Sequence, residues 1–116
     1  MPNIPLVEKH IVLNYDLGFK GDYQNLYAFL DEHKAVDCGN CNAAFAMSFS
    51  QDDFDVIYAE LRQALEQKIQ IEPNDRIYMT VTDATNKMKG KFLFGYRKRA
   101  IWEGYGNLGI NVTDQF

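Results

Sequence analysis

The spacing of apolar residues along this chain predicts which segments are strands and which are helices. Short β-branched and aromatic runs with a period near two predict strands at 10–16, 35–38, 43–49 and 76–81. Apolar residues three and four apart predict two amphipathic helices, one from Asp22 to near Lys34 and one from Ser50 to near Ile69. The predicted order is strand, helix, strand, strand, helix, strand.

Capping and turn residues set the expected bounds of these elements. Asp22 is a good N-cap for the first helix, because its carboxylate can accept a backbone N–H of the first turn. Ser50 followed by Asp53 has the form of a capping box for the second helix. Gly and Asn at 39–40, and Pro-Asn-Asp at 73–75, predict turns that precede the third and fourth strands.

This order is typical of an α+β protein with a ferredoxin-like βαββαβ two-layer sandwich, in which two helices cover one face of one antiparallel sheet. Residues 83–90 are polar and predict a loop, and the apolar runs at 92–94 and 100–102 predict an extra C-terminal hairpin or strand. A chain of 116 residues has the size of a single domain. We expect one domain over 1–116, with its core at about 10–104 and a basic insertion and tail in 83–116.

Composition excludes several classes of protein. With 47% hydrophobic and 14% aromatic residues, the chain is not expected to be disordered. It has no apolar run of the roughly 18 to 20 residues that a membrane span needs. Residues 1–9 hold two prolines and no apolar stretch like that of a secretion signal. We therefore expect a cytoplasmic protein without a membrane partner.

Cys38 and Cys41 form a lone CxxC pair, which is compatible with a redox pair or with half of a zinc site. A structural zinc site needs a second pair of ligands, and His10 and His33 stand apart in the sequence. The Gly and Asn between the cysteines predict a turn rather than the start of a helix. We favour ordinary reduced thiols.

The charges are unevenly distributed. The net charge of −4 argues against a protein that coats nucleic acid by bulk attraction. Half of the 12 basic residues nevertheless lie in one segment that contains no acid: Lys87, Lys89, Lys91, Arg97, Lys98 and Arg99. This segment is either a solvated loop or edge strand, or a local nucleic-acid-binding patch that contacts phosphates. Both interpretations remain open.

Four short motifs resemble those of the SinR-like branch of the CRISPR-associated Cas2-like proteins. They are Asn14-Tyr15-Asp16-Leu17, Asp22-Tyr23 followed by Leu26, Asp75-Arg76-Ile77-Tyr78, and Ala100-Ile101-Trp102-Glu103-Gly104. The resemblance spans most of residues 10–104. It implies the ferredoxin-like fold, a homodimer and an association with nucleic acid.

The resemblance also implies a role for Asp16, which matches the aspartate that closes the first strand in that family. There, this residue is implicated in metal-dependent cleavage of nucleic acid, with the two carboxylates of a homodimer facing one another. A carboxylate at the end of a strand can hold Mg²⁺, which polarises a phosphoryl oxygen. Asp16 is therefore both the catalytic and the metal-binding candidate. The alternative is that Asp16 caps the loop after its strand through backbone N–H groups.

Two classes of function follow. The first is a Cas2-like nucleic-acid-binding protein, a homodimer that is an Mg-dependent endonuclease if Asp16 holds a metal. The second is a non-catalytic interaction or inhibitor module, from a mobile element, phage or toxin–antitoxin system, that binds a protein or another macromolecular partner through acidic residues. The candidate acids are Asp52, Asp53, Asp55, Glu60 and Glu66. Tyr96 and Trp102 could stack on bases, or they could fill a core or a dimer seam.

Overall fold

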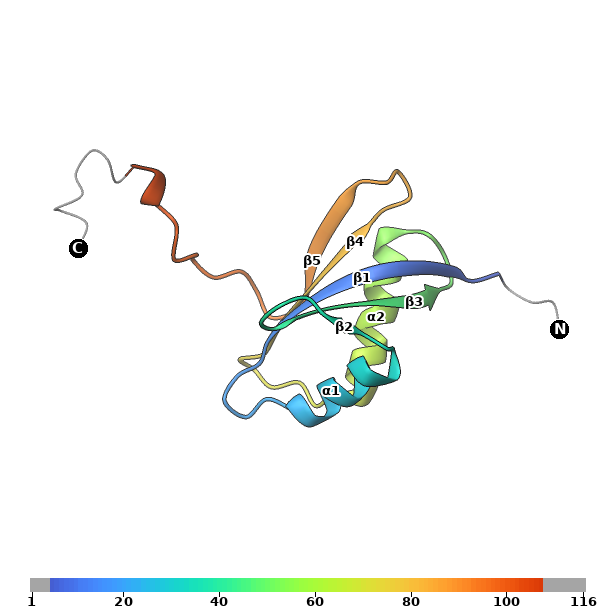
Figure 1. Cartoon of the computed structure of the whole chain (residues 1–116), viewed down its shortest axis with the longest axis horizontal. Coiled ribbons are helices and arrows are strands. Elements are labelled where there is room, and N and C mark those ends of the chain that lie inside the picture. The colour runs from blue at the N-terminus through green and yellow to red at the C-terminus, as the bar shows by residue number, and fades with distance from the viewer. Residues whose placement is uncertain (1–4, 108–116) are drawn as a thin grey trace.

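The computed structural model describes residues 5–107 of the 116-residue chain, which form an α+β fold with two helices on one antiparallel sheet (Figure 1). The helices are α1 (Tyr23–Glu32) and α2 (Phe54–Lys68), and a short 3₁₀ helix, η1, spans Tyr105–Asn107. The sheet contains β1 (Val7–Asp16), β2 (Val36–Asp37), β3 (Asn42–Phe49), β4 (Arg76–Thr82) and β5 (Met88–Phe94).

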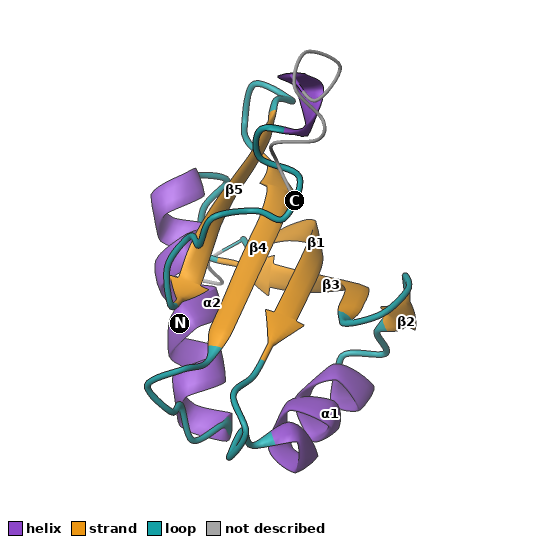
Figure 2. Cartoon of the chain, turned by 90° about the vertical axis from the view of Figure 1, so that its left-hand side faces the viewer, coloured by secondary structure: helices purple, strands orange, loops and turns teal. Residues whose placement is uncertain are grey.

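The five strands lie in the order β2-β3-β1-β4-β5, and every neighbouring pair is antiparallel. The central strand β1 pairs with strands on both sides, so that Val12 lies opposite Ala44 of β3 and Thr80 of β4. Figure 2 shows both helices on the same side of this sheet. Of the predicted extra C-terminal hairpin or strand, one strand is present: β5 pairs with β4 at the edge of the sheet.

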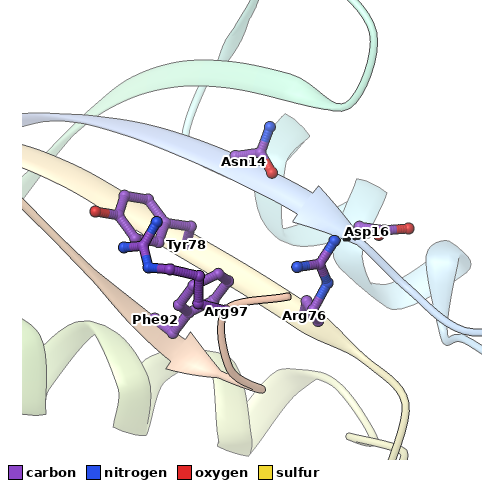
Figure 3. Close-up of a pocket in the computed structure, with 6 residues that line it drawn as sticks. All are labelled: Asn14, Asp16, Arg76, Tyr78, Phe92 and Arg97. Carbon is purple, nitrogen blue, oxygen red and sulfur yellow. Dashed lines mark hydrogen bonds and ion pairs between the residues drawn. The ribbon is translucent and has the colours of Figure 1, made fainter. Parts of the chain in front are cut away.

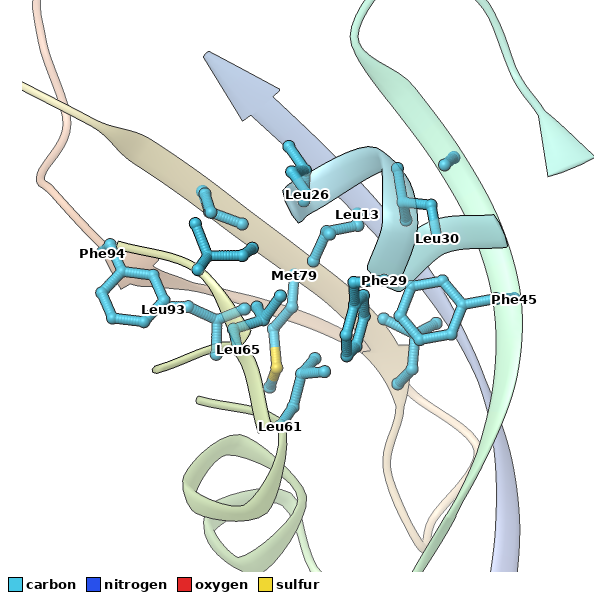
Figure 4. Packing of buried hydrophobic residues seen from close by; sticks show 14 of the residues in the cluster. Leu13, Leu26, Phe29, Leu30, Phe45, Leu61, Leu65, Met79, Leu93 and Phe94 are labelled. Atoms are coloured by element: carbon cyan, nitrogen blue, oxygen red, sulfur yellow. The ribbon is translucent and has the colours of Figure 1, made fainter. Parts of the chain in front are cut away.

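Alternation along the strands separates a buried face from an open one. Ile11 and Leu13 of β1 face the helices and are fully buried, and they pack in one cluster with residues such as Leu26 of α1 and Leu61 of α2 (Figure 4). Burial of each such side chain contributes roughly 1.5–3 kcal/mol. The intervening residues lie on the opposite face, here called the outer face, which neither helix covers within residues 5–107.

Both predicted helices are present, but the predicted start of the second is wrong. The Asp22 carboxylate accepts the N–H of Asn25 at 3.4 Å, as expected of an N-cap. In α2 the cap is Asp53, whose carboxylate accepts the N–H of Val56 at 3.1 Å. The Ser50 hydroxyl does not cap this helix and instead donates to the Glu60 carboxylate at 2.6 Å. The helix therefore begins three residues later than the capping box suggests.

The structure also corrects the segment after β4. The predicted loop at 83–90 is largely a tight turn, because an oxygen of Asp83 accepts the N–H groups of Thr85 and Lys87, each at 2.9 Å. Strand β5 consequently begins at Met88, earlier than predicted. The apolar run at 100–102, predicted as strand material, forms turns instead. It lies beyond Gly95, where a φ of +80° turns the chain away from β4.

The CxxC pair lies in the hairpin turn between β2 and β3, as predicted. Cys38 and Cys41 are both exposed and neither forms a disulfide. Cys41 has a φ of +60° and Gly39 a φ of +109°, which are values suited to a tight turn and not to the start of a helix. None of the helices in residues 5–107 is long and apolar enough to cross a membrane.

Candidate nucleic-acid interface

Asp16, the predicted catalytic residue, forms an ion pair with Arg76. The two residues are register partners at the end of β1 and the start of β4, and an Asp16 oxygen lies 3.1 Å from an Arg76 guanidinium nitrogen. The Asp16 side chain is 60% exposed and the Arg76 side chain 26% exposed. The carboxylate is thus at the surface, with a cation beside it.

Asp75, and not Asp16, holds the loop that follows β1. Asp75 is only 1% exposed, and its two oxygens accept the N–H groups of Gly18 and Glu72, each at 2.8 Å. These bonds join the loop after β1 to the turn before β4, and they fix the two strand ends that carry Asp16 and Arg76. Of the N–H groups of Leu17 to Phe19 that the capping alternative gives to Asp16, that of Gly18 is thus bonded to Asp75 instead.

Asp16 and Arg76 belong to a pocket of about 410 Å³ on the outer face, here called the sheet pocket. Its lining residues come from three adjacent strands and the segment after β5: Asn14, Asp16, Arg76, Tyr78, Phe92 and Arg97 (Figure 3). Its volume falls within the range of roughly 300–1,000 Å³ that is usual for small-molecule sites. The pocket thus combines a carboxylate, two arginines, an amide and two aromatic rings.

Two guanidinium groups lie near the same aromatic ring in this pocket. The central carbons of Arg76 and Arg97 are each 5.9 Å from the ring centre of Phe92, which is within cation–π range. The Nε of Arg76 is enclosed and has no hydrogen-bond partner within the described part of the chain. The donors of Arg76 are therefore only partly used by Asp16.

The aromatic residues of the pocket hold a defined geometry. Tyr78 and Phe92 are register partners whose ring centres lie 4.8 Å apart at 79°, an edge-to-face arrangement. The Tyr78 ring also lies over Gly90 of β5, where an added Cβ would come within 2.4 Å of the tyrosine hydroxyl. Glycine at this position therefore gives the Tyr78 ring the space it occupies.

A second glycine places Arg97 in the pocket. Gly95 has a left-handed φ of +80°, and a Cβ there would come within 2.8 Å of Arg76 Cγ and 2.7 Å of the Asp75 carbonyl oxygen. A side chain at this position would be strained by both its backbone angle and its neighbours. The chain can therefore turn closely around Arg76, which brings Arg97 back over Phe92.

Residues 95–107, here called the arm, line a second pocket of about 470 Å³ that adjoins the first. This arm pocket shares Arg76, Phe92 and Arg97 with the sheet pocket, and its other lining residues are Lys98, Arg99, Ala100, Ile101, Trp102 and Glu103. Figure 1 shows the arm leading away from the sheet after β5. The two pockets form one continuous surface that carries positive charge and aromatic rings.

The predicted basic segment is divided between two faces. Lys89 pairs with Asp83 at 3.2 Å, and the ammonium of Lys91 lies 4.2 Å from the ring centre of Tyr58 in α2. These two lysines, with Lys87 in the turn before them, are thus separate from the pockets. Arg97, Lys98 and Arg99 line the arm pocket, where Arg99 pairs with Glu103 at 3.4 Å.

Sequence reasoning overlooked Arg76, Tyr78 and Phe92 as site residues. A usable signal was present in β4, where Arg76 and Tyr78 occupy alternate positions and so must share a face. The register that places this face beside Asn14 and Asp16 is set by long-range strand pairing, which the sequence pattern alone does not reveal.

The residues around Asp16 do not by themselves make a magnesium site. Mg²⁺ is usually held by one or two carboxylates with water and phosphate oxygens, whereas Asp16 has the cation of Arg76 beside it. Within residues 5–107, no three histidine, cysteine, aspartate or glutamate side chains are grouped to hold a metal ion. The predicted site therefore depends on a second copy of the chain to supply a further carboxylate.

Comparison with known proteins adds no identification: no protein-family model, curated protein or solved structure matches this chain.

Proposed function

We propose that this chain is a nucleic-acid-binding protein of the Cas2-like type, and that the sheet pocket and the arm pocket form its binding surface. One observation carries the proposal: the guanidinium carbons of Arg76 and Arg97 each lie 5.9 Å from the ring centre of the half-buried Phe92, in a pocket that continues into Lys98 and Arg99. Arginine beside an aromatic ring is typical of nucleic-acid-binding sites, because a nucleic-acid strand carries phosphates that arginine can bind and flat bases that an aromatic ring can stack on.

The local charge is compatible with this role although the whole chain is acidic. Guanidinium groups bind phosphate oxygens through paired hydrogen bonds, and the exposed Arg97 lines both pockets. A protein with a net charge of −4 gains little from bulk attraction, so its affinity would depend on these few contacts. Binding should consequently be modest and salt-dependent.

The fold supports the same proposal. The strand order β2-β3-β1-β4, with both helices on one side, is compatible with the ferredoxin-like sandwich that the resemblance implies, and β5 is an addition at the edge. We include a homodimer in the proposal because Ile101 and Trp102 of the arm are 89% and 73% exposed. Large apolar side chains left exposed together are typical of an interaction surface.

The alternative of an acidic interaction module has less support. Several acids near α2 are already bonded within the chain: Asp52 pairs with Lys9, Glu66 pairs with Arg62, and Glu60 accepts from Ser50. Asp53 caps the helix. These carboxylates act mainly in local structure, which leaves less free negative charge for a partner.

Fluorescence anisotropy with labelled DNA and RNA, measured at about 50 mM and 200 mM salt, tests the proposal. The double variant Arg76→Gln/Arg97→Gln should weaken binding by about tenfold or more and reduce the slope of log affinity against log salt by about two. Lys89→Gln/Lys91→Gln removes the same charge from the helix side and should change affinity by less than about twofold. Failure to bind any nucleic acid at low salt, or equal losses in both variants, would refute the proposal.

Cleavage is a separate part of the proposal and needs its own assay. If two Asp16 carboxylates hold Mg²⁺ across a dimer, nuclease activity should require Mg²⁺ or Mn²⁺ and should be lost in Asp16→Asn. A variant that still cuts at the wild-type rate would show that the activity comes from another site or from a contaminant. Binding without cleavage would leave the nucleic-acid-binding proposal intact and refute the endonuclease.

A further inference from the structure

The geometry points to a specific ligand class: we propose that the sheet pocket binds one unpaired nucleotide of a single strand, with its base on the aromatic residues and its phosphate on the arginines. This inference rests on the proposed nucleic-acid-binding function and narrows it. The site is expected to accept a single strand rather than a duplex, and Phe92 is the side chain expected to discriminate between them.

The position of the two aromatic rings favours an unpaired base. Tyr78 and Phe92 are neighbours on the outer face, where the helices leave the sheet open, and both rings are only partly buried. A base inside a duplex has both of its flat faces covered by neighbouring base pairs, so it cannot stack on a protein ring without being extruded. An unpaired base has a free face, and stacking on an aromatic ring is the usual way to bind it.

The arginines complete the site for one nucleotide. Each guanidinium carbon is 5.9 Å from the ring centre of Phe92, so a base near this ring has its phosphate within reach of the same two side chains. Asn14 donates its amide to Asn42 at 2.8 Å, and Figure 3 shows its carbonyl oxygen directed toward β4. The pocket therefore offers a stacking surface, two phosphate donors and one acceptor for a base edge.

The arm pocket offers a surface on which the single-stranded nucleic acid can continue beyond this nucleotide. It adjoins the sheet pocket through Phe92 and Arg97 and continues along Lys98 and Arg99. Basic side chains that line a continuous surface beside an aromatic ring are typical of proteins that follow a single strand. A rigid duplex could contact the arginines but would leave the Phe92 ring without a base to stack on it.

The test measures binding of three matched probes to the intact chain: a short single-stranded DNA, the same strand in a duplex, and the same strand with abasic sites. The wild type should bind the single strand at least about fivefold more tightly than the duplex, and removal of the bases should cost about tenfold. Phe92→Leu should lose about tenfold on the intact strand and nothing on the abasic strand. Phe19→Leu changes a fully exposed phenylalanine elsewhere and should match the wild type.

The possible failures are distinguishable. If no probe binds at low salt, the proposed function and this inference both fall. If the duplex binds as tightly as the single strand, or if Phe92→Leu has no effect, nucleic-acid binding stands and the inference is overturned. An equal loss by Phe92→Leu on intact and abasic strands would likewise overturn it, because the effect would then come from altered structure or charge rather than from stacking.

Discussion

The ring of Tyr78 occupies the space that a side chain at Gly90 would need, since a Cβ at residue 90 would lie 2.4 Å from the tyrosine hydroxyl. Gly90→Ala should therefore push the ring out of position. We expect a loss of about 1 kcal/mol in unfolding free energy, measured by urea denaturation, and weaker binding of single-stranded DNA. The strain should be modest because the ring can swing toward solvent.

A double-mutant cycle isolates this contact. In a Tyr78→Ala background the ring is absent, so Gly90→Ala should be neutral or slightly stabilising, because alanine restricts the unfolded chain more than glycine does. The coupling between the two positions should then be about 1 kcal/mol. A Gly90→Ala effect of the same size in both backgrounds would mean that the Tyr78 ring is not what requires glycine.

Asp16 should compete with phosphate for Arg76, because its carboxylate already lies 3.1 Å from the guanidinium. Asp16→Asn should tighten binding of a labelled single strand by about two- to fivefold at low salt, and this gain should shrink at high salt. It should also be absent in an Arg76→Gln background. Asp37→Asn, which removes an exposed carboxylate on the far edge strand, is the control. Weaker binding by Asp16→Asn would indicate that the carboxylate contacts the ligand itself.

The elements of the fold were largely predictable because each rests on local patterning. Ile11 and Leu13, or Leu61 and Leu65, show the strand and helix periods directly in the sequence. Strand β5 was harder to find because Lys89, Gly90 and Lys91 conceal its alternation, although Lys91 packs its ammonium over Tyr58. Such half-exposed edge positions carry little apolar signal.

The site was less predictable than the fold because it depends on pairing between distant segments. The motif at the end of the first strand points to Asp16, but its ion-pair partner Arg76 is 60 positions away and is brought to it only by the register of β1 and β4. The basic residues are close together in the sequence, but Lys91 lies within β5, with its ammonium over Tyr58 of α2. Arg97 lies beyond Gly95, where the chain turns after the end of β5, and lines the sheet pocket instead.

The buried carboxylate of Asp75 should be the most important polar group for stability. It accepts two backbone N–H groups at 2.8 Å, and its removal would leave both without a partner. Asp75→Ala should lower the unfolding free energy by about 3 kcal/mol in urea denaturation, and Asp75→Asn by less, because its amide keeps one acceptor. Asp31→Asn, an exposed change at the end of α1, should cost almost nothing. A similarly small effect for Asp75→Ala would mean that water replaces the carboxylate.

The turn before β5 should weaken in acid. Hydrogen bonds from the Thr85 hydroxyl, and then from the Lys87 N–H, hold the pKa of Asp83 below its ordinary value of 3.8. Because the folded pKa is depressed, the stability that Asp83 contributes is present above about pH 4 and is lost as the pH falls through the folded pKa. Thr85→Val should raise the Asp83 pKa, as followed by NMR titration of the carboxyl carbon.

The same variant should be less stable than the wild type at neutral pH, and the difference should narrow at low pH, where Asp83 is protonated in both proteins. Urea midpoints across the pH range measure this. Thr82→Val changes a neighbouring exposed threonine and should leave the Asp83 pKa unchanged. An Asp83 pKa that does not move in Thr85→Val would show that the hydroxyl is not the main cause of its depression.

The arm should mediate self-association, since Ile101 and Trp102 expose large apolar side chains on the segment that leads away from the sheet. Light scattering coupled to gel filtration should give twice the 13.4 kDa mass of one chain at high concentration. Trp102 is the only tryptophan, so its emission should shift to the blue as the dimer forms and water leaves the ring. Ile101→Asp should raise the dissociation constant by about tenfold or more. Val36→Asp places the same charge on the opposite edge strand and should leave the dimer intact, whereas a monomeric wild type at every concentration would exclude this role for the arm.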